Sequence, residues 1–111
     1  FDMVLPICGE TITGFLQYNR DFPGRFYTVG VETDMSLYST DVPFSCVRHI
    51  DRVISTCITD WWNGRLEHNR TFGMEEDWVE LVVSGKYKKL LEPLSQEIHN
   101  QAKEMEANYA K

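Results

Sequence analysis

The segment from Phe44 to Trp62 limits the possible folds of this chain more than any other stretch. Wound as an α-helix, it gathers eight residues on one face, namely Cys46, Val47, Ile50, Val53, Ile54, Cys57, Ile58 and Trp61. Arg48, Arg52 and Thr59 fall on the opposite face. An apolar helix face has to be covered. We therefore predict a helix over residues 44–62 that lies across a sheet and supplies much of the core.

Residues 3–40 are predicted to form strands. The segments 3–8, 11–18, 25–31 and 35–40 are rich in β-branched and aromatic residues, and Gly, Pro, Asn and Asp separate them. Short connections of this kind are typical of hairpins. We expect an antiparallel meander of three to four strands packed on the central helix.

The C-terminal third is predicted to be mainly helical. Residues 74–83 alternate as a strand would, but their acidic start and the Ser84-Gly85 stop favour a helix, and the strand remains the alternative. Residues 86–110 carry one long apolar stripe, which Pro93 is expected to kink or split. The prediction is a single α+β domain spanning residues 1–111, with C-terminal helices after the meander and the central helix.

Composition narrows the possible partners and the compartment. The formal net charge of −6 argues against nucleic acid and against anionic membranes, and no apolar run approaches the roughly 20 residues of a membrane span. Three cysteines make no closed disulfide framework, so we expect reduced thiols and a cytoplasmic location. The chain begins at Phe1 rather than Met, so we expect a trimmed N-terminus, and a lost leader stays open.

No motif specifies a reaction or a cofactor. Cys46 and His49 are three apart on the predicted helix and so within reach of each other, but no orienting carboxylate is implied. The histidines lack the short paired spacing of zinc ligands, and the scattered glycines build no phosphate-binding loop. We predict no catalytic, cofactor-binding or metal-binding residues, and we expect a binding protein rather than an enzyme.

Contact residues are predicted on two surfaces. Trp62, with Arg48 and Arg52, lies outside the apolar face of the predicted helix, and Trp and Arg are frequent interface anchors. The alternative is that residues 74–83 fold back and pair Trp62 with Trp78. The second surface is the heptad-like C-terminal stripe, represented by Leu94, Ile98, Gln101, Met105 and Tyr109.

The predicted function is an acidic, non-enzymatic protein–protein interaction module. It would act as a homodimer and bind another protein as an inhibitor, an immunity-type protein or an adaptor. The alternative is a small-ligand-binding domain with a cavity between sheet and helix. That cavity would be lined by Phe15, Tyr18, Phe26, Tyr27, Tyr38 and Trp61.

Overall fold

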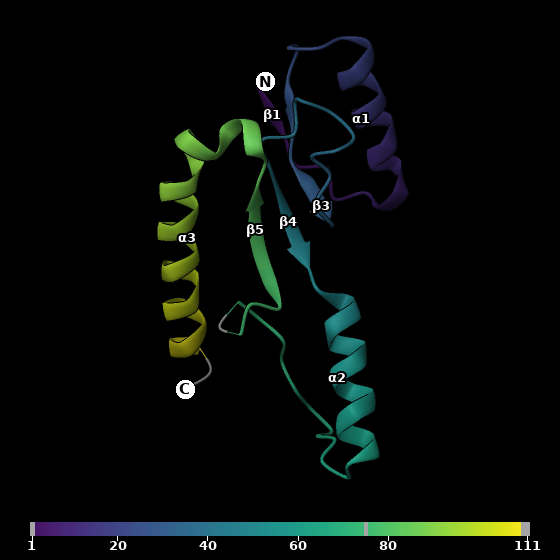
Figure 1. Ribbon diagram of the computed structural model, residues 1–111, viewed down its shortest axis with the longest axis vertical. Coiled ribbons are helices and arrows are strands. Elements are labelled where there is room, and N and C mark those ends of the chain that lie inside the picture. The colour runs from purple at the N-terminus through teal and green to yellow at the C-terminus, as the bar shows by residue number, and fades with distance from the viewer. Residues whose placement is uncertain (1, 75, 110–111) are drawn as a thin grey trace.

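The computed structural model describes residues 2–74 and 76–109 (Figure 1). The elements are β1 (Met3–Val4), the 3-10 helix η1 (Gly9–Thr11), α1 (Ile12–Asp21), β2 (Tyr27–Thr28), β3 (Gly30–Glu32), β4 (Phe44–Arg48), α2 (Ile50–Trp62), β5 (Val79–Val83), the 3-10 helix η2 (Gly85–Tyr87) and α3 (Lys88–Tyr109). The predicted α+β class is confirmed. The predictions also included residues 1, 75, 110 and 111, which lie outside the described residues.

The strands pair mainly in parallel. β1 pairs with β2 and β3 pairs with β4, both in parallel, and only β5 is antiparallel to its neighbour β4. β2 and β3 are separated by Val29 alone, whose N–H donates to the carbonyl of Val4 at 2.9 Å. Helix α1 connects β1 to β2, as a parallel pair requires. The predicted antiparallel meander is therefore wrong.

Helix α1 explains that error. Residues 11–18 were predicted as a strand, but Ile12, Leu16 and Asn19 are buried at helical spacing on one side of α1. The last predicted strand, residues 35–40, is a turn region in which the N–H of Tyr38 donates to the carbonyl of Met35 at 3.0 Å. Residues 25–31 contain β2 and the first two residues of β3, and residues 3–8 contain β1.

The predicted central helix is divided into a strand and a helix. Phe44–Arg48 form β4, which pairs with β3 on one edge and β5 on the other, and α2 begins only at Ile50. The strand alternative for residues 74–83 is the correct one from Val79 onward. Because β4 and β5 satisfy each other's backbone groups, pairing outweighs the helical pattern of both segments.

The core lies between α1 and the strands. Ile12, Leu16 and Val42 are buried together, with Val31 and Met35 packed against them. None of residues 50–62 is buried, so the prediction that this helix supplies much of the core is wrong. Helix α2 can project away from the sheet because the preceding strand, β4, already lies between β3 and β5.

Gly30 allows β3 and β4 to approach closely. A Cβ atom placed on Gly30 would lie 2.7 Å from the Cβ of Ser45 and closer still to its hydroxyl. The Ser45 hydroxyl is fully buried and accepts a hydrogen bond from the Met35 N–H at 3.1 Å. The missing side chain of Gly30 therefore lets Ser45 hold the turn that follows β3.

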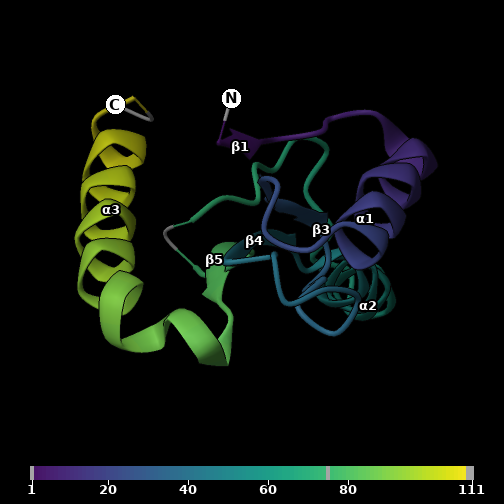
Figure 2. The same cartoon turned by 90° about the horizontal axis from the view of Figure 1, so that it is seen from above.

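The molecule is elongated. It measures 52 × 28 × 22 Å with a radius of gyration of 16.5 Å, against about 13 Å for a compact domain of similar length. Helix α2 projects from one end of the strands, α3 runs beside β5, and α1 lies on the other side (Figures 1 and 2). Pro93 lies inside α3. No helix in the described ranges is long and apolar enough to cross a bilayer.

Candidate functional site

A cavity of about 400 Å³ borders the carboxyl ends of β1 and β3. The loop after β1, the start of α1 and the turn after β3 line it with Ile7, Cys8, Gly9, Glu10, Ile12, Thr13, Val31, Glu32 and Met35. In open α/β sheets, ligands bind in the crevice outside the carboxyl ends of the strands. This position makes the cavity the candidate functional site.

Glu32 is the polar residue with the most unusual geometry at this cavity. It ends β3 with a φ of 75°, in the left-handed region that residues other than glycine rarely adopt. Its carboxylate accepts two hydrogen bonds from Arg48, one from Nε at 2.8 Å and one from Nη2. This bidentate contact raises the pKa of Arg48, through the hydrogen bond first and the charge second. Arg48 therefore fixes the Glu32 carboxylate at the end of the strand.

A histidine–carboxylate pair lies next to Arg48. His49 Nε2 is 2.8 Å from Glu80 Oε1 on β5, and the His49 N–H donates to the carbonyl of Trp78 at 2.9 Å. Cys46 lies in β4, so the helical spacing that would bring it to His49 does not exist. Burial raises the pKa of the Cys46 thiol, and the three cysteines are free.

The turn before β5 contacts both α2 and α3 through Asp77. On one side, the Asp77 carboxylate accepts a hydrogen bond from His99 at 3.0 Å and lies 3.2 Å from Lys103 Nζ, both on α3. On the other side, Arg52 of α2 donates to the Asp77 carbonyl at 3.1 Å, and its guanidinium lies 4.6 Å from the ring centroid of Trp78. Glu106 of α3 accepts the Met74 N–H at 2.7 Å.

Docking of α3 on this turn should weaken at acid pH. Lys103 and His99 hold the pKa of Asp77 below its ordinary value of 3.8. A lowered pKa means that the folded state favours the charged carboxylate. The contribution to stability is therefore present above that value and is lost as pH falls through the lowered pKa. We expect amide exchange in residues 99–109 to accelerate in that range, measured by NMR.

The control for this prediction is Asp77→Asn. Asparagine tolerates the left-handed backbone at this position (φ 60°) but carries no charge at any pH. The variant should exchange faster at neutral pH and show a flatter acid dependence. An unchanged acid dependence in Asp77→Asn would assign the effect to another group.

The structure separates the predicted contact residues of the first surface. Trp62 is 80% exposed at the end of α2, with its ring 6.3 Å from that of Trp61. Trp61 does not face the sheet as predicted, and Trp78 packs on Phe72 rather than on Trp62. Arg48 belongs to the candidate site and Arg52 to the turn before β5. A partner-binding role for Trp62, Arg48 and Arg52 stays a prediction.

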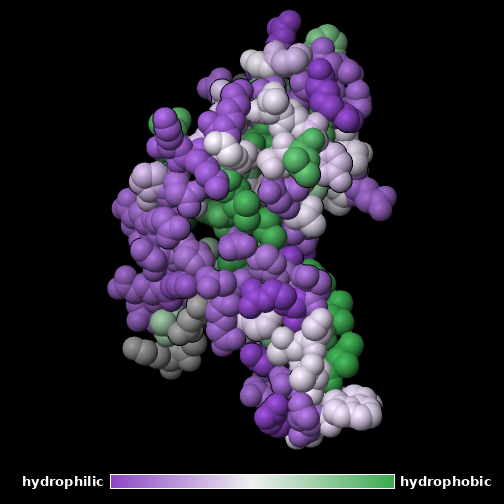
Figure 3. Space-filling view, in the orientation of Figure 1, coloured by the Kyte–Doolittle hydropathy of each residue, from purple (hydrophilic) through white to green (hydrophobic). Residues whose placement is uncertain are grey.

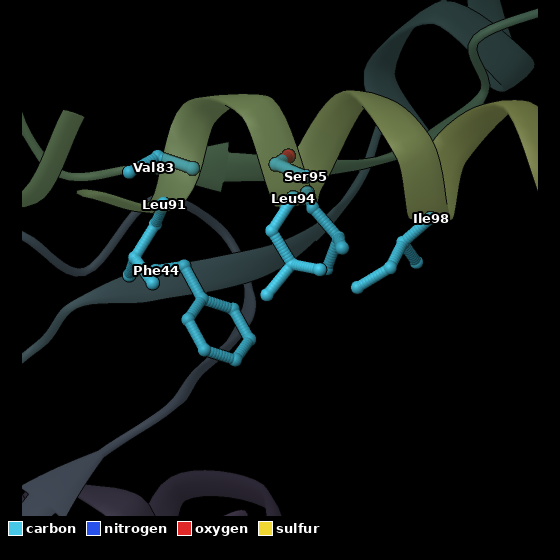
Figure 4. Close-up of a pocket in the computed structure, with 7 residues that line it drawn as sticks. Phe44, Val83, Leu91, Leu94, Ser95 and Ile98 are labelled. Atoms are coloured by element: carbon cyan, nitrogen blue, oxygen red, sulfur yellow. The ribbon is translucent and has the colours of Figure 1, made fainter. Parts of the chain in front are cut away.

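The second predicted surface lies partly on the sheet. Leu94 and Ile98 of α3 point with Leu91 toward Phe44 and Val83 (Figure 4). Gln101 donates to Glu97 at 3.3 Å, whereas Met105 and Tyr109 are exposed. A partner for this stripe likewise stays a prediction. Three of the residues predicted to line a sheet–helix cavity, Phe15, Tyr18 and Phe26, line a hollow of about 350 Å³ on α1 together with Thr11 and Gly14. Tyr38 and Trp61 are exposed elsewhere, so the predicted set is not brought together.

Sequence reasoning missed Glu32 and the cavity. A signal was present in the order of residues 3–32, where a strand, a Gly-containing loop, a helical pattern and another strand follow one another. Within residues 2–74 and 76–109, no group of three or more His, Cys, Asp or Glu side chains is placed to hold a metal ion.

Over the described residues the fold is a mixed α/β arrangement of three α-helices and two small sheets, and it resembles a solved structure. No protein-family model matches the sequence, and no curated protein matches it either. The chain is similar to the crystal structure of a transcriptional activator of the comK gene from Bacillus halodurans, with a TM-score of 0.72 and 18% sequence identity. The match covers 93% of this chain and 35% of that chain. The chain thus spans about a third of the length of that protein.

This likeness contradicts two predictions. The first is the acidic interaction module that acts as a homodimeric inhibitor or adaptor, and the second is the exclusion of nucleic acid. The protein that shares this fold is described as a transcriptional activator rather than as an inhibitor or adaptor, and at 18% identity the likeness extends to the fold alone. The exclusion of nucleic acid rested on net charge, which does not report on the fold. The interaction module rested on Trp62, on the C-terminal stripe and on the absence of an active-site constellation.

Proposed function

We propose that this chain is the ligand-sensing part of a regulator of transcription, and that nucleic acid is a partner of the whole regulator. The observation that carries the proposal is Glu32, held by Arg48 at the carboxyl end of a parallel strand and facing a cavity. Residues in rare backbone conformations cluster at functional sites, so the φ of 75° adds support. The fold likeness supplies the regulatory context.

The lining of the cavity suggests the class of ligand. Ile7, Ile12, Val31 and Met35 form apolar walls, whereas Glu10 and Glu32 supply carboxylates. A carboxylate accepts hydrogen bonds only, and its two oxygens offer about four acceptor positions. Arg48 occupies two of these on Glu32, which leaves others for the ligand. The ligand is a small molecule with hydroxyl or amine donors and one apolar face.

The cysteines support a reducing compartment for this function. Cys8 lies exposed at the cavity, and all three thiols are free. An exposed thiol persists where disulfides are kept reduced, which favours the cytoplasm.

A thermal-shift screen tests the proposal. The 111-residue chain would be heated with small metabolites that carry hydroxyl or amine groups. A ligand at 100 times its Kd should stabilise the fold by about 2.7 kcal/mol. Glu32→Gln should weaken the best ligand about 10- to 100-fold, because hydrogen bonds to a charged group contribute roughly 1.5–3 kcal/mol.

Glu92→Gln is the matched control. Glu92 lies on α3, accepts only a long hydrogen bond from Gln96 at 3.5 Å, and does not line the cavity. The Glu92→Gln substitution removes one negative charge, as Glu32→Gln does, and should leave the affinity for the ligand unchanged. Ligands that bind Glu32→Gln and the unmodified chain equally well would place their site elsewhere and refute the proposal.

A further inference from the structure

A polar cleft of about 360 Å³ lies between α3 and β5. The turn before β5, the strand itself and one face of α3 line it with Asp77, Glu80, Leu81, Ser95, Gln96, His99, Asn100 and Lys103. All of these residues except Leu81 are polar, and hydrophilic side chains prevail over α3 on the face shown in Figure 3. Small-molecule sites occupy roughly 300–1,000 Å³, so the cleft is large enough for a ligand. It shares no lining residue with the cavity at Glu32.

The polar cleft is built on packed, regular elements. Leu81 and Ser95 also line the apolar contact beneath α3, next to Leu94 and Ile98. The turn that supplies the other wall is held by the buried Trp78, which directly precedes β5. Side chains on packed helices and strands keep fixed positions, which lowers the cost of ordering them when a ligand binds.

One wall of the cleft presents free carboxylate oxygens. Asp77 Oδ1 lies 3.0 Å from His99 Nε2 and 3.2 Å from Lys103 Nζ, and Glu80 Oε1 lies 2.8 Å from His49 Nε2. Within residues 2–74 and 76–109, the second oxygen of each carboxylate accepts no hydrogen bond. Lys103 and His99 lower the pKa of Asp77, so this carboxylate is ionised at neutral pH. An ionised carboxylate only accepts hydrogen bonds, so this wall requires a ligand that donates.

The opposite wall, on α3, presents groups that donate. Asn100 and Gln96 carry amide N–H groups, and Lys103 has three N–H donors, not all of which can point at Asp77. The side-chain amide of Asn100 makes no hydrogen bond to any described residue. The wall on α3 therefore requires a ligand that accepts.

We propose that the polar cleft binds a hydroxyl-rich molecule of the monosaccharide or cyclic-polyol class. A hydroxyl group both donates and accepts, so neighbouring hydroxyls match the carboxylate wall and the wall on α3 at once. An amine only donates and a phosphate ion mainly accepts, so each matches one wall. A zwitterion requires positive and negative groups on separate walls, whereas Lys103 lies directly on Asp77.

An NMR titration of the 111-residue chain tests this proposal. The probes are glucose, galactose and myo-inositol, with putrescine as the amine and inorganic phosphate as the anion. At least one hydroxylated probe should shift the amide resonances of residues 77–81 and 95–103, and the side-chain amide of Asn100, in a saturable way. Putrescine and phosphate should not produce saturable shifts there.

Asn100→Ala and Asn108→Ala form a matched pair of variants. Both asparagines are exposed on α3, but only Asn100 lines the cleft. Asn100→Ala should weaken binding about 3- to 10-fold, the usual effect of losing one hydrogen bond, and Asn108→Ala should leave it unchanged. Alanine favours the helix at both positions, so both variants should fold.

Three results would overturn the proposal. They are the absence of saturable shifts with every hydroxylated probe, saturable shifts of the same residues with putrescine or phosphate alone, and equal affinities of Asn100→Ala and Asn108→Ala. The second result would show that the cleft selects a charge. A ligand at Glu32 should instead shift residues 7–13 and 31–35, so the two proposals fail or hold independently.

Discussion

Trp78→Ala should destabilise the fold by roughly 3–5 kcal/mol, the usual cost of emptying a buried aromatic site. Trp78 is 7% exposed, packs edge-on against Phe72 at 4.8 Å and donates from Nε1 to Glu76 at 2.9 Å. Arg52 covers its other side. Because total stability is typically about 5–15 kcal/mol, the variant should be largely unfolded at moderate urea concentrations. Urea unfolding followed by far-UV circular dichroism measures the effect.

Trp62→Ala is the matched control for this result. Trp62 is 80% exposed, so its removal should change the free energy of unfolding by no more than about 0.5 kcal/mol. The contrast between two tryptophans of one chain removes the uncertainty of comparing different residue types. Equal losses for Trp78→Ala and Trp62→Ala would show that the packing around Trp78 is not as described.

Asn19→Leu should cost about 1–3 kcal/mol, because the buried Thr28 hydroxyl loses its partner. Asn19 Nδ2 donates to the carbonyl of Phe26 at 3.0 Å, and Asn19 Oδ1 accepts from the Thr28 hydroxyl at 2.5 Å. Asn19 and Thr28 are almost completely buried, and together they tie α1 to β2. Each buried group that loses its partner costs roughly 1–3 kcal/mol. The free energy of unfolding in urea gives the value.

The double variant Asn19→Leu with Thr28→Val separates this cause from a change of shape. Replacing both partners with apolar groups removes the unpaired hydroxyl, so part of the loss should be recovered. If the double variant is as unstable as the sum of the two single variants, the hydrogen bond does not couple α1 to β2.

The sequence allowed the fold class to be predicted but not the topology. The long apolar stripe of residues 86–110 corresponds to α3, and the β-branched run after Arg25 corresponds to β2 and β3. Local periodicity was sufficient in both cases because the patterns were long or unambiguous. It failed for residues 11–18 and 44–48, where short apolar runs fit either period. Only pairing with distant strands decides such segments.

The candidate site could not be predicted for the same reason. Glu32 and Arg48 are 16 positions apart, and no spacing rule brings them together. They meet because β3 and β4 pair in parallel and end at the same edge. Residues 44–48 were predicted to be helical, so Arg48 was not placed on a strand next to Glu32. The error in topology therefore hid the site.

The parallel pairing of β1 with β2 also sets an order of folding. Met3 pairs with Tyr27, 24 positions away, so this contact requires closure of the intervening loop. Helix α1 fills that loop with local contacts, which form faster than distant strand pairs. We therefore expect α1 to form early and to bring the two strands together. On this path β1 pairs with β2 only after α1 has formed.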